Sequence, residues 1–169
     1  MLPLMSSHAE AIVVVTTGGT IDKSYFDALS QFQIGDSVIN RLLAIAQVTR
    51  PYRVIELLRK DSLELTDADR TTLRETIAAL PEQLIVVTHG TDTMTQSAAI
   101  LTEVKDKTIV LTGALAPARF AESDASFNLG MALAAAQSLP PGVYITMNGQ
   151  VFRAGHVQKD RNNARFVAE

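Results

Sequence analysis

Short apolar runs that recur along the chain predict its strands. The first run, Ala11–Val15, contains no polar side chain, and two glycines follow it closely. An apolar run without alternation is typical of a strand that is buried on both faces, as in a parallel sheet. The sequence therefore predicts strands at Ala11–Val15, Arg53–Leu58, Leu84–Val87, Thr108–Leu111 and Val143–Met147.

Helices are expected between these strands, because apolar residues there recur at helical spacing. The expected helices are Ser37–Gln47 with Asp36 or Ser37 as N-cap, Thr66 to about Leu80, about Thr93–Leu101 with Asp92 or Thr93 as cap, and Ala125–Ser138. Regular alternation of strand and helix indicates an α/β domain. We expect one domain over residues 1–169, with a mostly parallel sheet between two helical layers.

The connecting segments carry weaker patterns. Asn148-Gly149 predicts a hairpin turn into Gln150–Phe152, because both residues tolerate positive φ. Residues 21–28 are polar and aperiodic, which predicts a loop that could act as a lid over the end of the first strand. The tail, residues 153–169, has no clear period.

Composition excludes several classes of function. The 169 residues carry a formal net charge of −3, which is not typical of proteins that bind nucleic acids or membrane surfaces. There is no cysteine, so disulfides, thiolate nucleophiles and cysteine-based zinc sites are excluded. His8, His89 and His156 lack metal-ligand spacing, and we expect neither a metal nor a cofactor. We see no signal peptide or membrane span and expect a soluble, cytoplasmic protein.

Candidate chemistry lies at the predicted strand ends. Thr16-Thr17-Gly18-Gly19-Thr20 lacks the third glycine of a dinucleotide motif and the lysine of a phosphate-binding loop, so it is either an ordinary turn or a turn that presents Thr20 as a nucleophile. The segment from Thr88 to Met94 is rich in hydroxyl groups, and helix capping by Asp92 would account for only part of it. By themselves, Ser62 and Glu64 are typical of a solvated connector, and Lys159 of a charged tail.

Three strand ends together carry a family resemblance. Their sequences are Thr-Gly-Gly-Thr-Ile, His-Gly-Thr-Asp-Thr-Met and Leu-Thr-Gly-Ala, in this order. The set resembles the bacterial-type L-asparaginases, and the resemblance covers essentially the whole chain but only the N-terminal domain of that family. It implies a flavodoxin-like fold, hydrolysis of L-asparagine and no cofactor.

The resemblance also implies a role for each matching residue. Thr20 would be the nucleophile, Tyr25 the lid tyrosine beside it, and Lys159 the lysine paired with Thr91 and Asp92. The residues implied in substrate binding are Gly19, Ser62 for the α-carboxylate, Leu63, Gly90, Thr91, Asp92 for the amino group, and the backbone of Ala114. A threonine hydroxyl needs a base to attack an amide, which a lysine held by Asp92 could supply.

Some features depart from the family pattern. Leu63 stands where relatives usually have a polar residue, and Tyr25 lies closer to Thr20 in sequence. No second domain is expected, so Asp92 and Glu64 would replace an acid that a neighbouring subunit otherwise supplies, and we expect weaker substrate binding.

The alternatives to an L-asparaginase are an asparagine/glutamine hydrolase, a non-enzymatic amino-acid-binding module, and a component of a larger amidotransferase. We also expect a homo-oligomer, a dimer or a tetramer.

Overall fold

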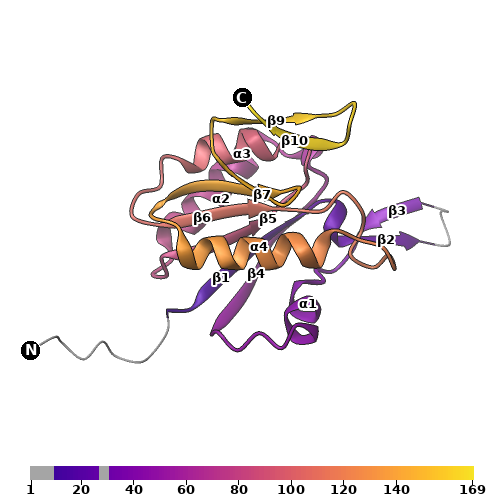
Figure 1. Cartoon of the computed structure of the whole chain (residues 1–169), viewed down its shortest axis with the longest axis horizontal. Coiled ribbons are helices and arrows are strands. Elements are labelled where there is room, and N and C mark those ends of the chain that lie inside the picture. Colours follow the sequence, from indigo (N-terminus) through magenta and orange to yellow (C-terminus); the bar gives the residue numbers. More distant parts are fainter. Residues whose placement is uncertain (1–9, 27–30) are drawn as a thin grey trace, which may run out of the picture.

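A six-stranded, mostly parallel sheet organises the part of the chain that the computed structural model describes, residues 10–26 and 31–169 (Figure 1). Its strands run in the order β4 (Tyr52–Lys60), β1 (Ile12–Gly18), β5 (Leu84–Thr88), β6 (Thr108–Thr112), β7 (Gly142–Met147) and β8 (Gln150–Arg153). All neighbours pair in parallel except β7 and β8. The predicted three-layer α/β fold is therefore confirmed.

Apolar side chains on both faces explain why the strand sequences do not alternate. Val13 and Val15 of β1 point into one core cluster, whereas Ile12 and Val14 point into the other. Successive side chains of a strand face opposite ways, so a strand between two helical layers needs apolar residues at every position.

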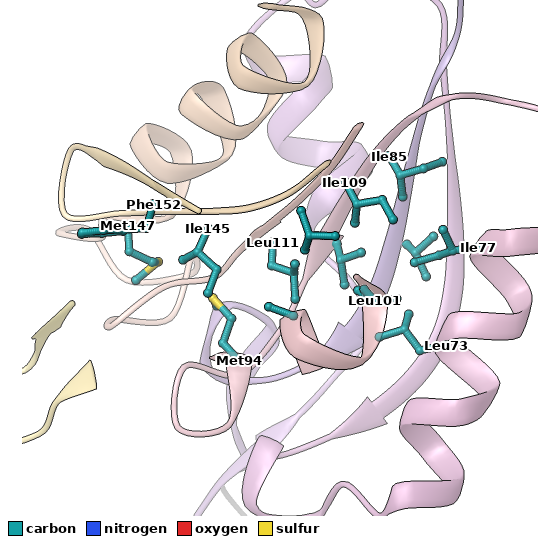
Figure 2. Packing of buried hydrophobic residues seen from close by; sticks show 14 of the residues in the cluster. Leu73, Ile77, Ile85, Met94, Leu101, Ile109, Leu111, Ile145, Met147 and Phe152 are labelled. Carbon is teal, nitrogen blue, oxygen red and sulfur yellow. The ribbon is translucent and has the colours of Figure 1, made fainter. Parts of the chain in front are cut away.

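Four helices cover the described sheet. On one face lie α2 (Asp67–Ala79) and α3 (Met94–Leu101), and on the other lie α1 (Ile39–Ile45) and α4 (Ala125–Ser138). Figure 2 shows Leu73 and Ile77 of α2 and Leu101 of α3 packed near Ile85 and Ile109 of the sheet. No described helix is long and apolar enough to cross a membrane.

Two small hairpins stand outside this sheet (Figure 1). Strand β2 (Lys23–Phe26) pairs with β3 (Gln31–Ile34), and β9 (Val157–Asp160) pairs with β10 (Arg165–Ala168). The expectation of a loop over residues 21–28 was wrong for residues 21–26, because a 3₁₀ turn, η1 (Thr20–Asp22), leads into β2. Residues 27–30 lie outside the described part. Each strand of these hairpins has only four residues, so neither hairpin leaves a long alternation in the sequence.

The helix caps agree with the sequence only in part. Thr66 caps α2 in a reciprocal capping box with Asp69, as its sequence predicts. Asp36 and Ser37 do not occupy the N-cap of α1: Val38 does, and its amide donates to Asp22 Oδ1 at 2.9 Å. Thr93 is the N-cap of α3, but its side chain makes no capping hydrogen bond. The predicted Asn148-Gly149 turn is confirmed, with φ of 54° and 69°.

Candidate active site

The strand order places two glycine turns at the switch point of the sheet. The chain passes from β1 to β4 on one side and later to β5 on the other. In open α/β sheets, ligands bind outside the carboxyl ends of the strands at such a point. The segments that follow β1 and β5 carry Thr20 and Thr91, so the topology brings both threonines to the edge where a ligand is expected.

Close backbone packing holds these two turns together. Gly19 has φ 84° and ψ −176°, a conformation that is essentially restricted to glycine. A Cβ atom on Gly19 would lie 2.5 Å from the backbone nitrogen of Gly90. The amide of Gly19 also donates to the carbonyl of Lys60 at 3.0 Å, which ties the turn to the end of β4. Thr20 directly follows Gly19, and Thr91 directly follows Gly90. The contact between the two glycines therefore holds the backbones of the two threonines near each other.

Lys159, Thr91 and Asp92 form a hydrogen-bonded cluster at this edge. Lys159 Nζ donates to Thr91 Oγ1 at 2.7 Å and to Asp92 Oδ1 at 2.8 Å. The hydrogen bond from Lys159 is the main cause that lowers the pKa of Asp92 below its ordinary value, with the charges of Lys159 and Arg161 acting in the same direction. Asp92 is therefore an ionised carboxylate at neutral pH.

The C-terminal hairpin brings Lys159 to this cluster from a distant part of the chain. Val157 and Phe166 anchor β9 and β10 in the core that α2 and α3 cover, and Phe166 is 1% exposed. The amide of Phe166 donates to Asn148 Oδ1 at 2.7 Å, which ties the hairpin to the turn between β7 and β8. Lys159 is thus held on a strand that is anchored on both sides.

The segment after β4 contributes Ser62 to the same edge. Ser62 is buried in the short turn η3 (Ser62–Glu64), and a Cβ atom on Gly90 would lie 2.6 Å from the Cβ of Ser62. Thr93 Oγ1 donates to the carbonyl of Ser62 at 2.8 Å, and the amide of Thr93 donates to Ser62 Oγ at 3.3 Å. Thr93 therefore links the ends of β4 and β5. Leu63, beside it, is 66% exposed.

The segment after β6 is held rigid beside these turns. The Asp124 carboxylate accepts from the amides of Leu115, at 2.9 and 3.0 Å, and Ala116, at 3.1 Å. Asn128 donates to the carbonyl of Gly113 at 2.9 Å. Ala114 lies within this braced segment and is buried. The sequence alone indicates no role for Asp124 or Asn128, although their spacing of four residues places them on one face of a helix start.

Asp22 lies buried between Thr20 and the β2–β3 hairpin. Its carbonyl accepts from the amide of Gly35 at 3.0 Å and from Arg119 Nη1 at 2.9 Å, so it joins the two ends of the hairpin. Burial raises the pKa of the Asp22 carboxyl to about 6, against the lowering effect of the Val38 amide. Asp22 was not predicted as a site residue, because nothing in the local sequence pattern shows that it is buried.

The other expected site residue on this hairpin is Tyr25. Its backbone belongs to β2, and its side chain lies outside the part of the structure that is described. Lys23 Nζ lies 3.3 Å from Asp61 Oδ2, an ion pair that joins the hairpin to the segment carrying Ser62. Within residues 10–26 and 31–169, no three histidine, aspartate or glutamate side chains are grouped as metal ligands.

Comparisons with known proteins agree with this arrangement. The family model described as "Asparaginase, N-terminal" matches residues 11–166. A glutaminase-asparaginase from Acinetobacter glutaminasificans is 32% identical over 165 residues, which cover 89% of this chain and 50% of that protein. L-asparaginase I from Vibrio cholerae superposes with a TM-score of 0.82 at 25% identity, covering 95% of this chain and 51% of that one.

A thermostable L-asparaginase from Thermococcus kodakarensis superposes with a TM-score of 0.80 at 26% identity and covers 94% of this chain and 51% of that one. The chain thus spans about half the length of the relatives that it matches. With its sheet order, its glycine turns and the family match over nearly all its residues, this chain belongs to the asparaginase family and corresponds to the N-terminal part of its members.

Proposed function

We propose that this chain is an amidohydrolase that converts L-asparagine to L-aspartate and ammonia, with Thr20 as the nucleophile. The observation that carries the proposal is a threonine turn at the switch point beside a lysine–threonine–aspartate cluster, with Lys159 Nζ 2.7 Å from Thr91 Oγ1 and 2.8 Å from Asp92 Oδ1. Relatives named L-asparaginase and glutaminase-asparaginase support the same class of reaction.

The reaction divides into two steps. Thr20 Oγ attacks the carbon of the side-chain amide, so a C–O bond forms and the C–N bond breaks. The nitrogen leaves as ammonia and takes up the proton that Thr20 loses. Water then hydrolyses the β-acyl ester, which releases aspartate and restores the Thr20 hydroxyl. Splitting one difficult displacement into two easier ones is the usual advantage of a covalent intermediate.

The cluster around Lys159 is suited to moving a proton during these steps. Because Lys159 donates to Thr91 Oγ1, the hydroxyl hydrogen of Thr91 is free to point toward a substrate or a water. Ionised Asp92 is suited to binding the α-ammonium group of an amino acid. The roles of Tyr25 beside Thr20 and of Ser62 at the substrate carboxylate belong to the same proposal.

Backbone groups would complete the site. Gly19 and Gly90 have no side chain, which allows the segments after β1, β4 and β5 to pack closely against one another, and the braced segment at Ala114 offers fixed backbone groups beside them. A single fixed amide that stabilises a developing oxyanion contributes about 3 kcal/mol to catalysis. Leu63 would line the outer wall, where its exposed side chain offers an apolar contact instead of a hydrogen bond.

Glutamine is a second candidate substrate, because the relative from Acinetobacter glutaminasificans is named a glutaminase-asparaginase. One methylene group changes the binding free energy in a pocket by only about 1–3 kcal/mol. We also propose that residues 1–169 act as a single catalytic domain, that the chain forms a homo-oligomer, and that it is located in the cytoplasm. The relatives are about twice as long as this chain.

Ammonia release from L-asparagine and from L-glutamine tests the proposal. We expect the purified chain to release ammonia from asparagine and the Thr20→Ala variant to release none above the uncatalysed rate. Thr72→Ala is the matched control, because Thr72 is an exposed threonine on α2. Release by the wild type and by Thr20→Ala at equal rates would contradict the nucleophile assignment. No release from either amide at millimolar concentration would favour a non-enzymatic binding module.

A further inference from the structure

A chain of buried polar side chains runs from helix α2 to the glycine turn after β5. Arg70 Nε donates to Ser97 Oγ at 3.2 Å, Ser97 Oγ lies 2.7 Å from His89 Nε2, and His89 Nδ1 lies 2.6 Å from the carbonyl oxygen of Gly90. All three side chains are at most 6% exposed. The residue after Gly90 is Thr91, so this chain of hydrogen bonds ends at the candidate site.

The chemistry of the two ends gives every hydrogen bond a direction. A carbonyl oxygen only accepts, so His89 Nδ1 carries a hydrogen. Burial lowers the pKa of His89 to about 4, so the ring is neutral at pH 7 and its Nε2 accepts from the Ser97 hydroxyl. A guanidinium only donates, so Ser97 Oγ accepts from Arg70. The Gly90 carbonyl thus selects the tautomer of His89, and Arg70 supports it by occupying one lone pair of Ser97 Oγ while the hydroxyl hydrogen points to His89 Nε2.

The chain of hydrogen bonds acts on the candidate site through the carbonyl group of Gly90. The described peptide bonds are all trans, so the C=O of Gly90 and the N–H of Thr91 point in opposite directions. While His89 holds the carbonyl toward α2 and α3, the amide of Thr91 points away from these helices. Gly90 also packs directly against Gly19 and Ser62. A rotated Gly90 peptide would therefore displace the segments after β1, β4 and β5 together.

We infer that Arg70 is a positioning residue for the proposed reaction: through Ser97 and His89 it holds the Gly90–Thr91 peptide in the orientation that the site requires. This inference rests on the proposed function. Arg70 itself is fixed from its other side, because Nη1 donates to the carbonyl of Leu65 at 3.2 Å. The guanidinium fork that binds both partners is not reproduced by a lysine or a methionine.

Two variants interrupt the chain at different links. Arg70→Met removes the donor, and Ser97→Ala removes the hydroxyl but retains the arginine. The control is Arg74→Met, on the same helix one turn later, where Arg74 forms an ion pair with Glu103 at 2.6 Å away from this chain of hydrogen bonds. ¹⁵N NMR of the imidazole reports the tautomer of His89, and steady-state kinetics separate kcat from KM.

We expect a single Nδ1–H tautomer of His89 in the wild type and in Arg74→Met, and a mixture in Arg70→Met and Ser97→Ala. We expect kcat for asparagine to fall about 10- to 100-fold in both interrupted variants, because misplacement of a site by about 1 Å has costs of this order. The double variant should lose no more than the worse single variant, since both changes break the same chain.

An unchanged tautomer and an unchanged kcat in Arg70→Met would overturn the inference. Additive losses in the double variant would also overturn it, because they would indicate two independent structural defects. If Arg70→Met does not fold, Ser97→Ala provides the same two measurements. If the wild-type chain hydrolyses no amide, the proposed function and the role of Arg70 in positioning the site for it both fail, whereas a tautomer that changes with Arg70→Met would still support the hydrogen-bond order.

Discussion

Replacing Asp22 with asparagine should stabilise the fold above pH 6 and leave its stability nearly unchanged at pH 4. Burial raises the pKa of this carboxyl from 3.8 to about 6. Between these two pH values the folded chain keeps a proton that the unfolded chain has lost. The free energy of unfolding therefore falls as pH rises through this window. An asparagine carries no titrating group and keeps an oxygen that accepts from the Val38 amide.

The expected size follows from the shift of the pKa. One pKa unit corresponds to about 1.4 kcal/mol, so Asp22 should reduce the free energy of unfolding by about 3 kcal/mol at pH 7 relative to pH 4. The neighbouring side chains that shift the pKa of Asp22 are Ser37, Glu56 and Arg119, and all three are retained in the variant. The stability difference between Asp22→Asn and the wild type should grow from near zero at pH 4 to about 3 kcal/mol at pH 7.

His89 should produce the opposite slope in the same pH range. Burial lowers its pKa from 6.5 to about 4, so between these values the unfolded chain binds a proton that the folded chain does not. Stability then rises with pH, by about 3 kcal/mol over the window. In the wild type these two contributions nearly cancel. In Asp22→Asn the rise caused by His89 remains, so the profile of the variant should be steeper.

Urea unfolding of both proteins at several pH values between 4 and 7.5 measures these differences. Asp36→Asn is the control, because the Asp36 side chain is 81% exposed and pairs with Arg59 on the surface. We expect the profile of this control to run parallel to that of the wild type. A parallel profile for Asp22→Asn as well would refute the reasoning, since it would mean that Asp22 titrates alike in the folded and unfolded chain.

Two further substitutions test how the site is held. Gly19→Ala should destabilise the chain by at least about 2 kcal/mol in thermal unfolding and abolish activity, whereas Gly155→Ala, at the same φ of 84° but with open space around it, should show the backbone strain alone. Phe166→Ala should lower the free energy of unfolding by about 3–5 kcal/mol and reduce ammonia release, because it loosens the hairpin that carries Lys159. Phe127→Ala, at a phenylalanine that is 63% exposed, is the matched control, and equal effects of the two phenylalanine variants would contradict this anchoring.

The local elements of this protein could be read from its sequence. The apolar runs of β1 and β5 and the Ala-rich helix α4 lie where their patterns predict, because hydrophobic periodicity depends on residues close together in the chain. The hairpins β2–β3 and β9–β10 were missed, because their strands are short and leave no repeating pattern.

The candidate site was predictable only as separate motifs. Thr20, Thr91 and Asp92 stand out at strand ends because neither a turn nor a helix cap requires so many hydroxyl groups there. Lys159 lies 68 residues from Thr91, in a tail without a pattern, so the sequence alone indicates a solvated lysine. Its role was suggested by family resemblance, and the tertiary structure supplies the contact.

The sequence by itself determined the strands of the main sheet, the helices that cover it, and which turns have no side chain to block a close approach. The tertiary structure alone decided that β1 and β5 are neighbours, that Gly19 meets Gly90, and that Arg70 and Asp22 are buried. The physical reason is that local patterns report the preferences of nearby residues. The burial of a polar group, and with it a shifted pKa or a fixed hydrogen bond, depends on residues that only the fold brings together.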